Sequence, residues 1–209
     1  MELIFLNSKI QNEAFFKLSY GLFVVSSKKD NKDNGCILNT VMQITDNPKR
    51  IMIAINKENF TCNMLAESEI FNISVLSQKA DMSLFENFGF KSGKDNDKFS
   101  DIDFKSRSEN GIYYLTEYSN AYFSAKVIKV IDCGTHLAFL ADITEARILN
   151  DEPSMTYQYY FDNVKPKPTP KKKGFVCKIC GYVYEGETLP PDFICPLCKH
   201  PASDFEPIE

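Results

Sequence analysis

The sequence predicts a mostly β domain with a few helices, followed by a small C-terminal domain that folds around four cysteines. Three observations support this fold class. Residues 20–150 contain short, β-branched apolar runs bounded by turn residues. Residues 164–174 are rich in proline and lysine, a composition that favours neither helix nor sheet. After them come two Cys-x-x-Cys pairs, separated by fourteen residues.

The apolar runs predict strands at residues 22–26, 37–45, 51–56, 71–76, 121–131 and 137–148. Helices are expected near residues 12–18 and at residues 59–67, and a third is expected around residues 80–88. The stretch at 91–110 is polar and predicts an irregular excursion.

Composition excludes several classes of function. The chain has 209 residues, a net charge of -4 and a pI near 5.4, which argues against nucleic-acid binding. The first nine residues lack the pattern of a signal peptide, and no apolar run approaches the roughly 18 residues of a membrane span. We therefore expect a cytoplasmic protein without a membrane partner. In a reducing compartment its seven cysteines predict metal ligands or buried thiols, and Cys36, Cys62 and Cys133 are expected to be small buried hydrophobes.

The proline and lysine segment divides the chain into residues 1–163, a linker at 164–174 and residues 175–209. Its alternating prolines favour an extended polyproline II conformation. Five lysines lie in the linker, whereas residues 175–209 carry six acids against two lysines. A solvated spacer is the favoured interpretation of the lysines, and a docking patch for an acidic partner is the alternative.

The four cysteines of the last segment have the spacing of a metal site. Cys177 and Cys180 form one pair, and Cys195 and Cys198 form the other. Two such turns can present four thiolates to one tetrahedral ion, and a domain of this size needs the metal to fold. The ligands alone suit iron and zinc equally.

The residues around these pairs resemble rubredoxins. The similarity includes GYVY at 181–184 and LPPDF at 189–193. It implies iron at the four cysteines and an aromatic core of Tyr182, Phe193 and Phe205. Lys199 replaces a glycine that is usual in the family, which puts the N–H to sulfur bonds of the second turn in question. His200 is expected to be a surface residue, because four thiolates complete the shell.

The first domain has no Gly-x-Gly-x-x-Gly or Walker loop among its glycines. In the strand predicted at 37–45, Asn39, Gln43 and Thr45 share one face, which either binds the polar edge of a flavin or faces solvent. Lys57 and Thr61 stand at a predicted helix start, where backbone N–H groups could bind a phosphate. The alternative is that Asn59 only caps the helix and Lys57 is solvated.

Several segments of the first domain resemble the flavin reductase-like, FMN-binding split-barrel family. They are YGLFVV at 20–25, ILNTVMQIT at 37–45, INKENFT at 55–61, FGFKSGKD at 88–95, DCGTHL at 132–137 and MTYQYY at 155–160. The resemblance implies a split β-barrel, a homodimer, and FMN near the subunit interface. It also implies that a nicotinamide approaches the flavin near His136, for which a purely structural role is the alternative. The FMN contacts that it implies are Asn39, Thr40, Gln43, Asn56, Lys57, Asn59 and Thr61.

The whole chain resembles the high-molecular-weight rubredoxins, which join both domains. This implies an electron-transfer oxidoreductase that passes electrons from NAD(P)H through FMN to the iron and on to a soluble acceptor such as a flavodiiron protein, which reduces oxygen or nitric oxide. Two alternatives remain. One is a non-catalytic ligand-binding barrel with a structural zinc ribbon. The other is a free-flavin or ferric reductase with an accessory rubredoxin domain.

Overall fold

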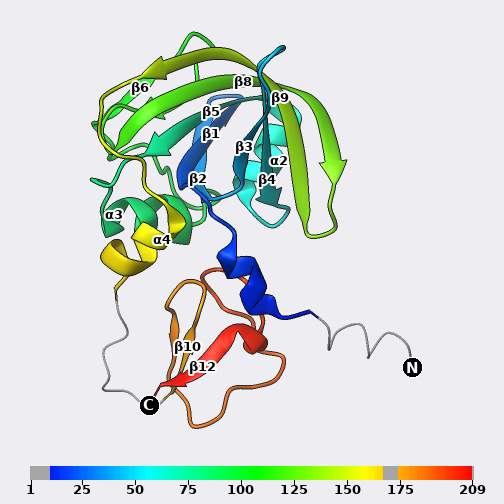
Figure 1. Cartoon of the computed structure of the whole chain (residues 1–209), viewed down its shortest axis with the longest axis vertical. Coiled ribbons are helices and arrows are strands. Elements are labelled where there is room, and N and C mark those ends of the chain that lie inside the picture. Colours follow the sequence, from blue (N-terminus) through cyan, green and yellow to red (C-terminus); the bar gives the residue numbers. More distant parts are fainter. Residues whose placement is uncertain (1–9, 167–173, 209) are drawn as a thin grey trace.

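The computed structural model describes residues 10–166 and 174–208, which form a large β domain and a small C-terminal domain packed beneath it (Figure 1). The chain start at 1–9, residue 209 and the linker residues 167–173 lie outside the described residues, so the predicted polyproline conformation there stays a prediction. None of the described helices has the length and hydropathy needed to cross a membrane.

The large domain is built on one antiparallel sheet of seven strands, in the order β2-β1-β5-β8-β9-β4-β3. The mostly β prediction is therefore confirmed. The strands are β1 (Phe23–Lys29), β2 (Lys32–Leu38), β3 (Val41–Thr45), β4 (Arg50–Asn56), β5 (Ile70–Leu76), β8 (Ser119–Asp132) and β9 (His136–Ile148).

The strand order requires the sheet to close into a barrel. Strands β2 and β3 stand at the two ends of the order, which in a flat sheet would place them about 29 Å apart. Only Asn39 and Thr40 join them, and a link of that length spans at most about 11 Å. The sheet therefore curves until its two ends meet, as the ribbon in Figure 1 shows.

The single strand predicted at 37–45 is wrong, because the chain bends at Asn39 and Thr40. Leu38 is buried at the end of β2, whereas Met42, which would share its face in a continuous strand, is exposed in β3. The Thr40 hydroxyl donates to the Ala54 carbonyl at 2.7 Å and so attaches the bend to β4. No glycine or proline marks the bend, so turn residues alone do not reveal it.

Two apolar clusters stabilise the barrel. The first fills its interior with Ile53, Phe71 and Phe139, all fully buried, and receives Leu65 from α2 (Phe60–Ser68). The second lies outside the sheet beneath the short helices. It contains Leu22, Leu76, Phe85, Phe88, Met155 and Tyr160. Each such side chain contributes roughly 1.5–3 kcal/mol by its burial.

Helices occur in all three predicted regions. They are η1 (Asn12–Lys17), α2, α3 (Met82–Phe85) and η2 (Glu86–Phe90). The chain also forms α4 (Tyr157–Tyr159) and η3 (Tyr160–Val164), which were not predicted. Asn59 caps α2, as the alternative interpretation of this helix start had it, since its side-chain oxygen accepts from the Thr61 N–H at 3.0 Å.

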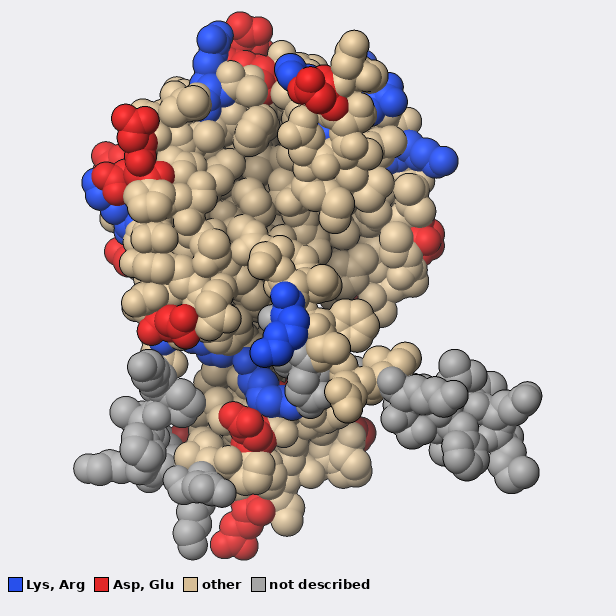
Figure 2. All heavy atoms as spheres, in the orientation of Figure 1, with Lys and Arg blue, Asp and Glu red and all other residues tan. Residues whose placement is uncertain are grey.

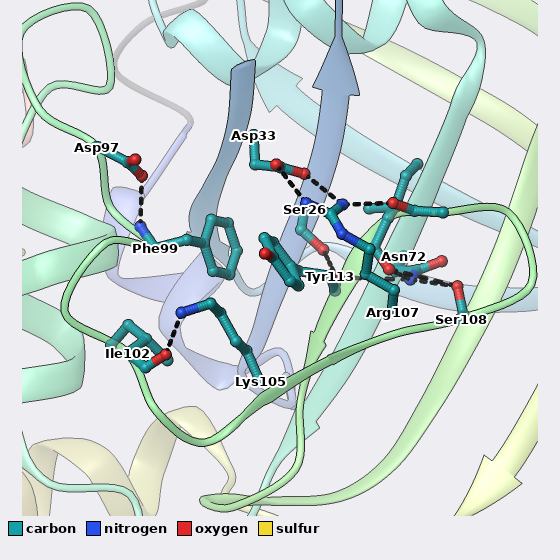
Figure 3. Close-up of polar contacts among 12 residues, drawn as sticks. Ser26, Asp33, Asn72, Asp97, Phe99, Ile102, Lys105, Arg107, Ser108 and Tyr113 are labelled. Atoms are coloured by element: carbon teal, nitrogen blue, oxygen red, sulfur yellow. Dashed lines mark hydrogen bonds and ion pairs between the residues drawn. The ribbon is translucent and has the colours of Figure 1, made fainter. Parts of the chain in front are cut away.

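The excursion at 91–110 is tied to the sheet by polar contacts (Figure 3). The Arg107 guanidinium donates to both carboxylate oxygens of Asp33 at 2.9 and 2.8 Å, and it lies 3.6 Å from the Tyr113 ring centroid. The Asn72 amide donates to the Ser108 hydroxyl at 2.7 Å. A two-stranded sheet, β6 (Lys105–Arg107) with β7 (Tyr113–Leu115), ends the excursion.

The small domain contains a three-stranded sheet, β10 (Gly174–Cys177), β11 (Val183–Tyr184) and β12 (Phe205–Ile208), and the short helix η4 (Ala202–Asp204). The predicted aromatic core is confirmed: the Phe193 and Phe205 rings meet edge to face, with centroids 5.4 Å apart, and Tyr182 packs beside them. This aromatic core packs against the cysteines of both turns.

Candidate metal centre and adjoining cleft

The four predicted cysteine ligands come together at the end of the small domain that faces the barrel. Their sulfur atoms all lie within 4.8 Å of one another. The Cys177 and Cys198 sulfurs are 3.5 Å apart, as are those of Cys180 and Cys195. A metal–sulfur bond of about 2.3 Å requires about 3.8 Å between sulfurs in a tetrahedron, so this donor set fits one iron or zinc ion.

The two cysteine turns have the same local geometry. In the first, Gly181 has φ 80° and its N–H donates to the Cys177 carbonyl at 2.8 Å. In the second, Lys199 has φ 62° and its N–H donates to the Cys195 carbonyl at 2.9 Å. Lys199 thus adopts the left-handed conformation that favours glycine. The presence of lysine at a position where the family usually has glycine does not alter the turn.

Backbone N–H groups also reach the sulfurs in both turns. The Tyr182 N–H donates to the Cys180 sulfur, and the His200 N–H donates to the Cys198 sulfur in the matching position of the second turn. The doubt about N–H to sulfur bonds in the second turn is therefore resolved in favour of the bond. Such bonds stabilise the thiolates and tune the potential of a bound metal.

The thiols influence one another strongly. Hydrogen bonds with Cys180 and Cys198 hold the pKa of the Cys177 thiol well below its usual range. The bond to Cys177 in turn raises the pKa of Cys180 to about 12. Four neighbouring thiols cannot all ionise without a cation, so metal binding displaces protons from this site.

A cleft of about 660 Å³ lies where the barrel meets the small domain. The barrel side comes from Asn56, Asn59 and Phe60 and from residues 88–94, the end of η2 and the chain after it. The other side comes from residues 196–199, which include Cys198. Figure 2 shows basic side chains where the two domains meet. The lysines that line the cleft are Lys91, Lys94, Lys98 and Lys199.

Of the predicted flavin residues, Asn56 and Asn59 line this cleft, and Thr61 lies just behind them. Thr61 is fully buried, and its hydroxyl accepts from the Asn34 amide at 2.9 Å. The second amide atom of Asn34, its oxygen, is buried without a hydrogen-bond partner among the described residues. A polar cluster therefore surrounds the start of α2.

Lys57 and His136 meet at the adjoining ends of β4 and β9. Asn56 is opposite His136 in the register, and the Lys57 N–H donates to the Thr135 carbonyl at 3.0 Å. The Lys57 ammonium lies 2.6 Å from the Asp132 carboxylate. Burial lowers the pKa of His136 below its usual value, and the charge of His200 on the small domain lowers it further.

The remaining predicted residues lie along β3 and its start. Thr40 is bonded to Ala54, two residues before Asn56, and Asn39 precedes it in the bend. Gln43 is opposite Ile51 and is exposed, which places it about 16 Å along β4 from the level of Asn56. The structure therefore does not bring Gln43 to the cleft. The flavin contacts of all seven residues stay predictions.

Lys98 is a cleft residue that the sequence did not reveal. Its side chain is 4 % exposed, and its ammonium donates to the Gly35 and Phe88 carbonyls at 2.9 and 3.1 Å. Burial lowers the pKa of Lys98. It stands in the polar stretch at 91–110, where one lysine gives no pattern that distinguishes it from solvated neighbours.

The three cysteines outside the metal site differ from one another. Cys36 and Cys62 are buried as predicted, and burial raises the pKa of Cys62 to about 11. The prediction is wrong for Cys133, which is exposed in the turn between β8 and β9. A free cysteine usually behaves as a small buried hydrophobe, but here the hairpin tip extends into solvent.

Comparisons with known proteins match both domains. The flavin reductase like domain family matches residues 15–167, and the rubredoxin-like domain of rubrerythrin matches residues 175–206. A high molecular weight rubredoxin of Moorella thermoacetica is 36 % identical over 95 % of this chain and 100 % of its own length. A ferric-chelate reductase (NAD(P)H) of Archaeoglobus fulgidus is 38 % identical over 71 % of this chain and 87 % of its own length.

Solved structures share the barrel fold. The NADH:FAD oxidoreductase SgcE6 of Streptomyces globisporus, in complex with NAD and FAD fragments, superposes with a TM-score of 0.62 at 19 % identity, over 69 % of this chain and 84 % of that one. The flavin reductase HpaC complexed with NADP+ has a TM-score of 0.60 at 21 % identity, over 70 % and 93 % of the two chains.

Proposed function

This chain belongs to the flavin reductase-like family and joins that domain to a rubredoxin-like one, and from this premise we propose that it passes electrons from NAD(P)H through FMN to iron held by four cysteines. It is a flavin-dependent NAD(P)H oxidoreductase. The bound flavin would accept a hydride and release single electrons to the iron. The iron would then reduce a soluble acceptor.

One observation carries the proposal: a single cleft is lined both by predicted flavin residues and by a predicted metal ligand. Asn56 and Asn59 belong to the barrel side and Cys198 to the small-domain side. A flavin in this cleft would lie next to a thiolate of the iron site. Direct transfer of single electrons between the two centres needs this proximity.

The donor set around the cleft supports FMN as the flavin. The start of α2, capped by Asn59, directs the positive end of its helix dipole toward a phosphate in the cleft, and Lys57 adds a cation beside it. The buried ammonium of Lys98 adds positive charge that would favour a reduced, anionic flavin ring. His136, next to Asn56 in the register, would border the face that a nicotinamide approaches.

The resemblance to high-molecular-weight rubredoxins supports a flavodiiron protein, which reduces oxygen or nitric oxide, as the acceptor. Ile194 and Leu197 are exposed on the small domain and would offer it an apolar contact near the metal. A homodimer is proposed as well. Met42 and Ile44 on β3 and Ile128 and Val130 on β8 are exposed apolar side chains that a second copy would cover.

Anaerobic mixing with NADH tests the electron path. The purified, iron-loaded protein is mixed with NADH, and flavin and iron absorbance are followed separately. We expect the flavin to bleach first and the iron to follow in the same molecule, with NADPH compared in parallel. A zinc-substituted sample is the matched control, in which the flavin should bleach at the same rate. Iron that stays oxidised beside fully reduced flavin would contradict the proposal, and a protein that holds only zinc after growth in iron would support the binding-module alternative.

A second candidate, a ferric or free-flavin reductase with an accessory small domain, is favoured by the 38 % identity to a ferric-chelate reductase. The zinc-substituted protein separates the two functions. If it reduces a ferric chelate as fast as the iron-loaded protein does, the iron site is accessory to that activity.

A further inference from the structure

Lys165 belongs to the segment predicted as linker, and in the structure it contacts both the barrel and the small domain. Its backbone N–H donates to the Tyr160 carbonyl at 2.8 Å, which anchors it to η3. Its ammonium crosses to the small domain and donates to the Lys178 and Ile179 carbonyls, at 3.3 Å each. Both carbonyls lie in the first cysteine turn, between two metal ligands.

The surroundings hold this ammonium group in place. It lies 4.4 Å from the centroid of the Phe161 ring, a favourable cation–π position. The side chain is half-buried, and burial lowers the pKa of Lys165 while the thiolates of Cys180, Cys177 and Cys198 act in the opposite direction. Glu206 adds a smaller attraction. A partly desolvated cation therefore stands beside the metal site.

The first cysteine turn has room for this lysine because it contains a glycine. A Cβ atom on Gly181 would lie 3.0 Å from the Lys165 side chain, closer than ordinary van der Waals contact. The left-handed backbone of Gly181 explains part of the requirement for glycine, and the approach of Lys165 supplies a second reason.

We propose that Lys165 is a positioning residue that docks the cysteine site against the barrel cleft, and that its charge makes this docking tighter when the site is reduced. The inference rests on the proposed iron. Four thiolates with ferric iron carry a formal charge of -1. One electron, delivered by the flavin, brings the charge to -2, and no bond is made or broken. A fixed cation attracts the second state more strongly.

Because binding and reduction are thermodynamically linked, tighter docking of the ferrous state changes the reduction potential of the iron. If the small domain docks more tightly in the ferrous state than in the ferric state, docking also makes the iron easier to reduce. The rise in reduction potential corresponds to the free energy by which docking prefers the ferrous state. For a one-electron couple, a tenfold preference corresponds to about 59 mV. We expect a preference of this order in the intact chain.

A potentiometric titration of the iron-loaded, full-length protein tests the charge. Lys165→Met, which keeps an unbranched apolar side chain, should lower the iron potential by about 59 mV, a tenfold loss of preference. Lys165→Arg should retain most of the wild-type value. Lys126→Met removes one charge from an exposed lysine of β8 and should leave the potential unchanged. An unchanged potential in Lys165→Met, or an equal shift in Lys126→Met, overturns the proposal.

Docking itself is measured without electron transfer, so that the outcome does not depend on NAD(P)H or flavin. Zinc and gallium give the tetrathiolate site the charges of ferrous and ferric iron, respectively. By small-angle scattering the zinc-loaded wild type should be more compact than the gallium-loaded one, and in Lys165→Met this difference should vanish. Equal compactness of the two wild-type forms overturns the redox-linked docking, even if electrons still flow from NADH to iron.

Discussion

Lys199 adopts a left-handed backbone, with φ 62°, at the turn position that Gly181 occupies in the first cysteine pair. A residue with a Cβ atom is about 1–2 kcal/mol less stable there than in its usual conformation. The turn still forms, because hydrogen bonds such as that from the Lys199 N–H to the Cys195 carbonyl fix the backbone. The site therefore holds local strain that a glycine would relieve.

Replacing Lys199 by glycine should raise the free energy of unfolding of the metal-loaded small domain by about 1 kcal/mol. The measurement is guanidinium unfolding followed by loss of the metal absorbance. Gly181→Ala is the control and should destabilise the same domain, since it adds a Cβ atom at φ 80°. A Lys199→Gly variant that is no more stable than wild type would show that the turn is unstrained.

Single residues were predictable from sequence where their chemistry is local. The four ligands follow from the two cysteine pairs, because each pair lies within one turn. Lys98 was not predictable: its ammonium bonds to Gly35, 63 residues away, and only the folded chain brings these groups together. Cys133 was misassigned because its exposure depends on how far the hairpin of β8 and β9 extends.

Among the elements, α2 was the most predictable and β3 the least. A capping asparagine begins α2 within one residue of the expected start, and capping is a local interaction. The break between β2 and β3 has no glycine or proline to announce it, and it is imposed by closure of the barrel. Where a bend serves the whole sheet, a local pattern does not reveal it.

The start of α2 is the element at which a flavin phosphate is expected. Lys57→Glu should weaken FMN binding by at least tenfold, because a carboxylate would face the phosphate and also Asp132, now 2.6 Å from the Lys57 ammonium. Quenching of FMN fluorescence by the flavin-free protein measures the affinity. The iron content should not change.

Asp132→Asn is the matched control for this experiment. It frees the Lys57 ammonium without altering its charge, so FMN should bind as well as in wild type or more tightly. If both variants bind FMN with the wild-type affinity, the phosphate lies elsewhere in the cleft.

In the whole molecule, the two domains share a cleft that neither domain's sequence pattern indicates. The linker sequence predicts only how far the small domain can move from the barrel, since the ten residues from Lys165 to Gly174 span roughly 30 Å when extended. The docked arrangement depends on contacts such as that of Lys165 with the Ile179 carbonyl. These contacts join surfaces that fold separately, so composition and spacing do not specify them.

The tether predicts intramolecular electron transfer. After rapid reduction of the flavin, iron reduction should follow first-order kinetics whose rate does not change with protein concentration, since tethering gives a local concentration that can reach the millimolar range. Cleavage at a protease site introduced near Pro168 should make the step slower and concentration-dependent. Stopped-flow absorbance measures both. A rate proportional to concentration in the intact chain would show that the tether does not serve this transfer.

The pairing of β4 with β9 has a consequence for biosynthesis. Arg50 is opposite Asp142, so this residue of β4 has no partner in β9 until 92 further residues have been made. Synthesis proceeds from the N-terminus, and pairings this distant form late. The cysteine turns begin at Cys177, after all strands of the barrel sheet. The strands of the barrel therefore leave the ribosome before the cysteine turns do, so the barrel can close before the metal site is complete.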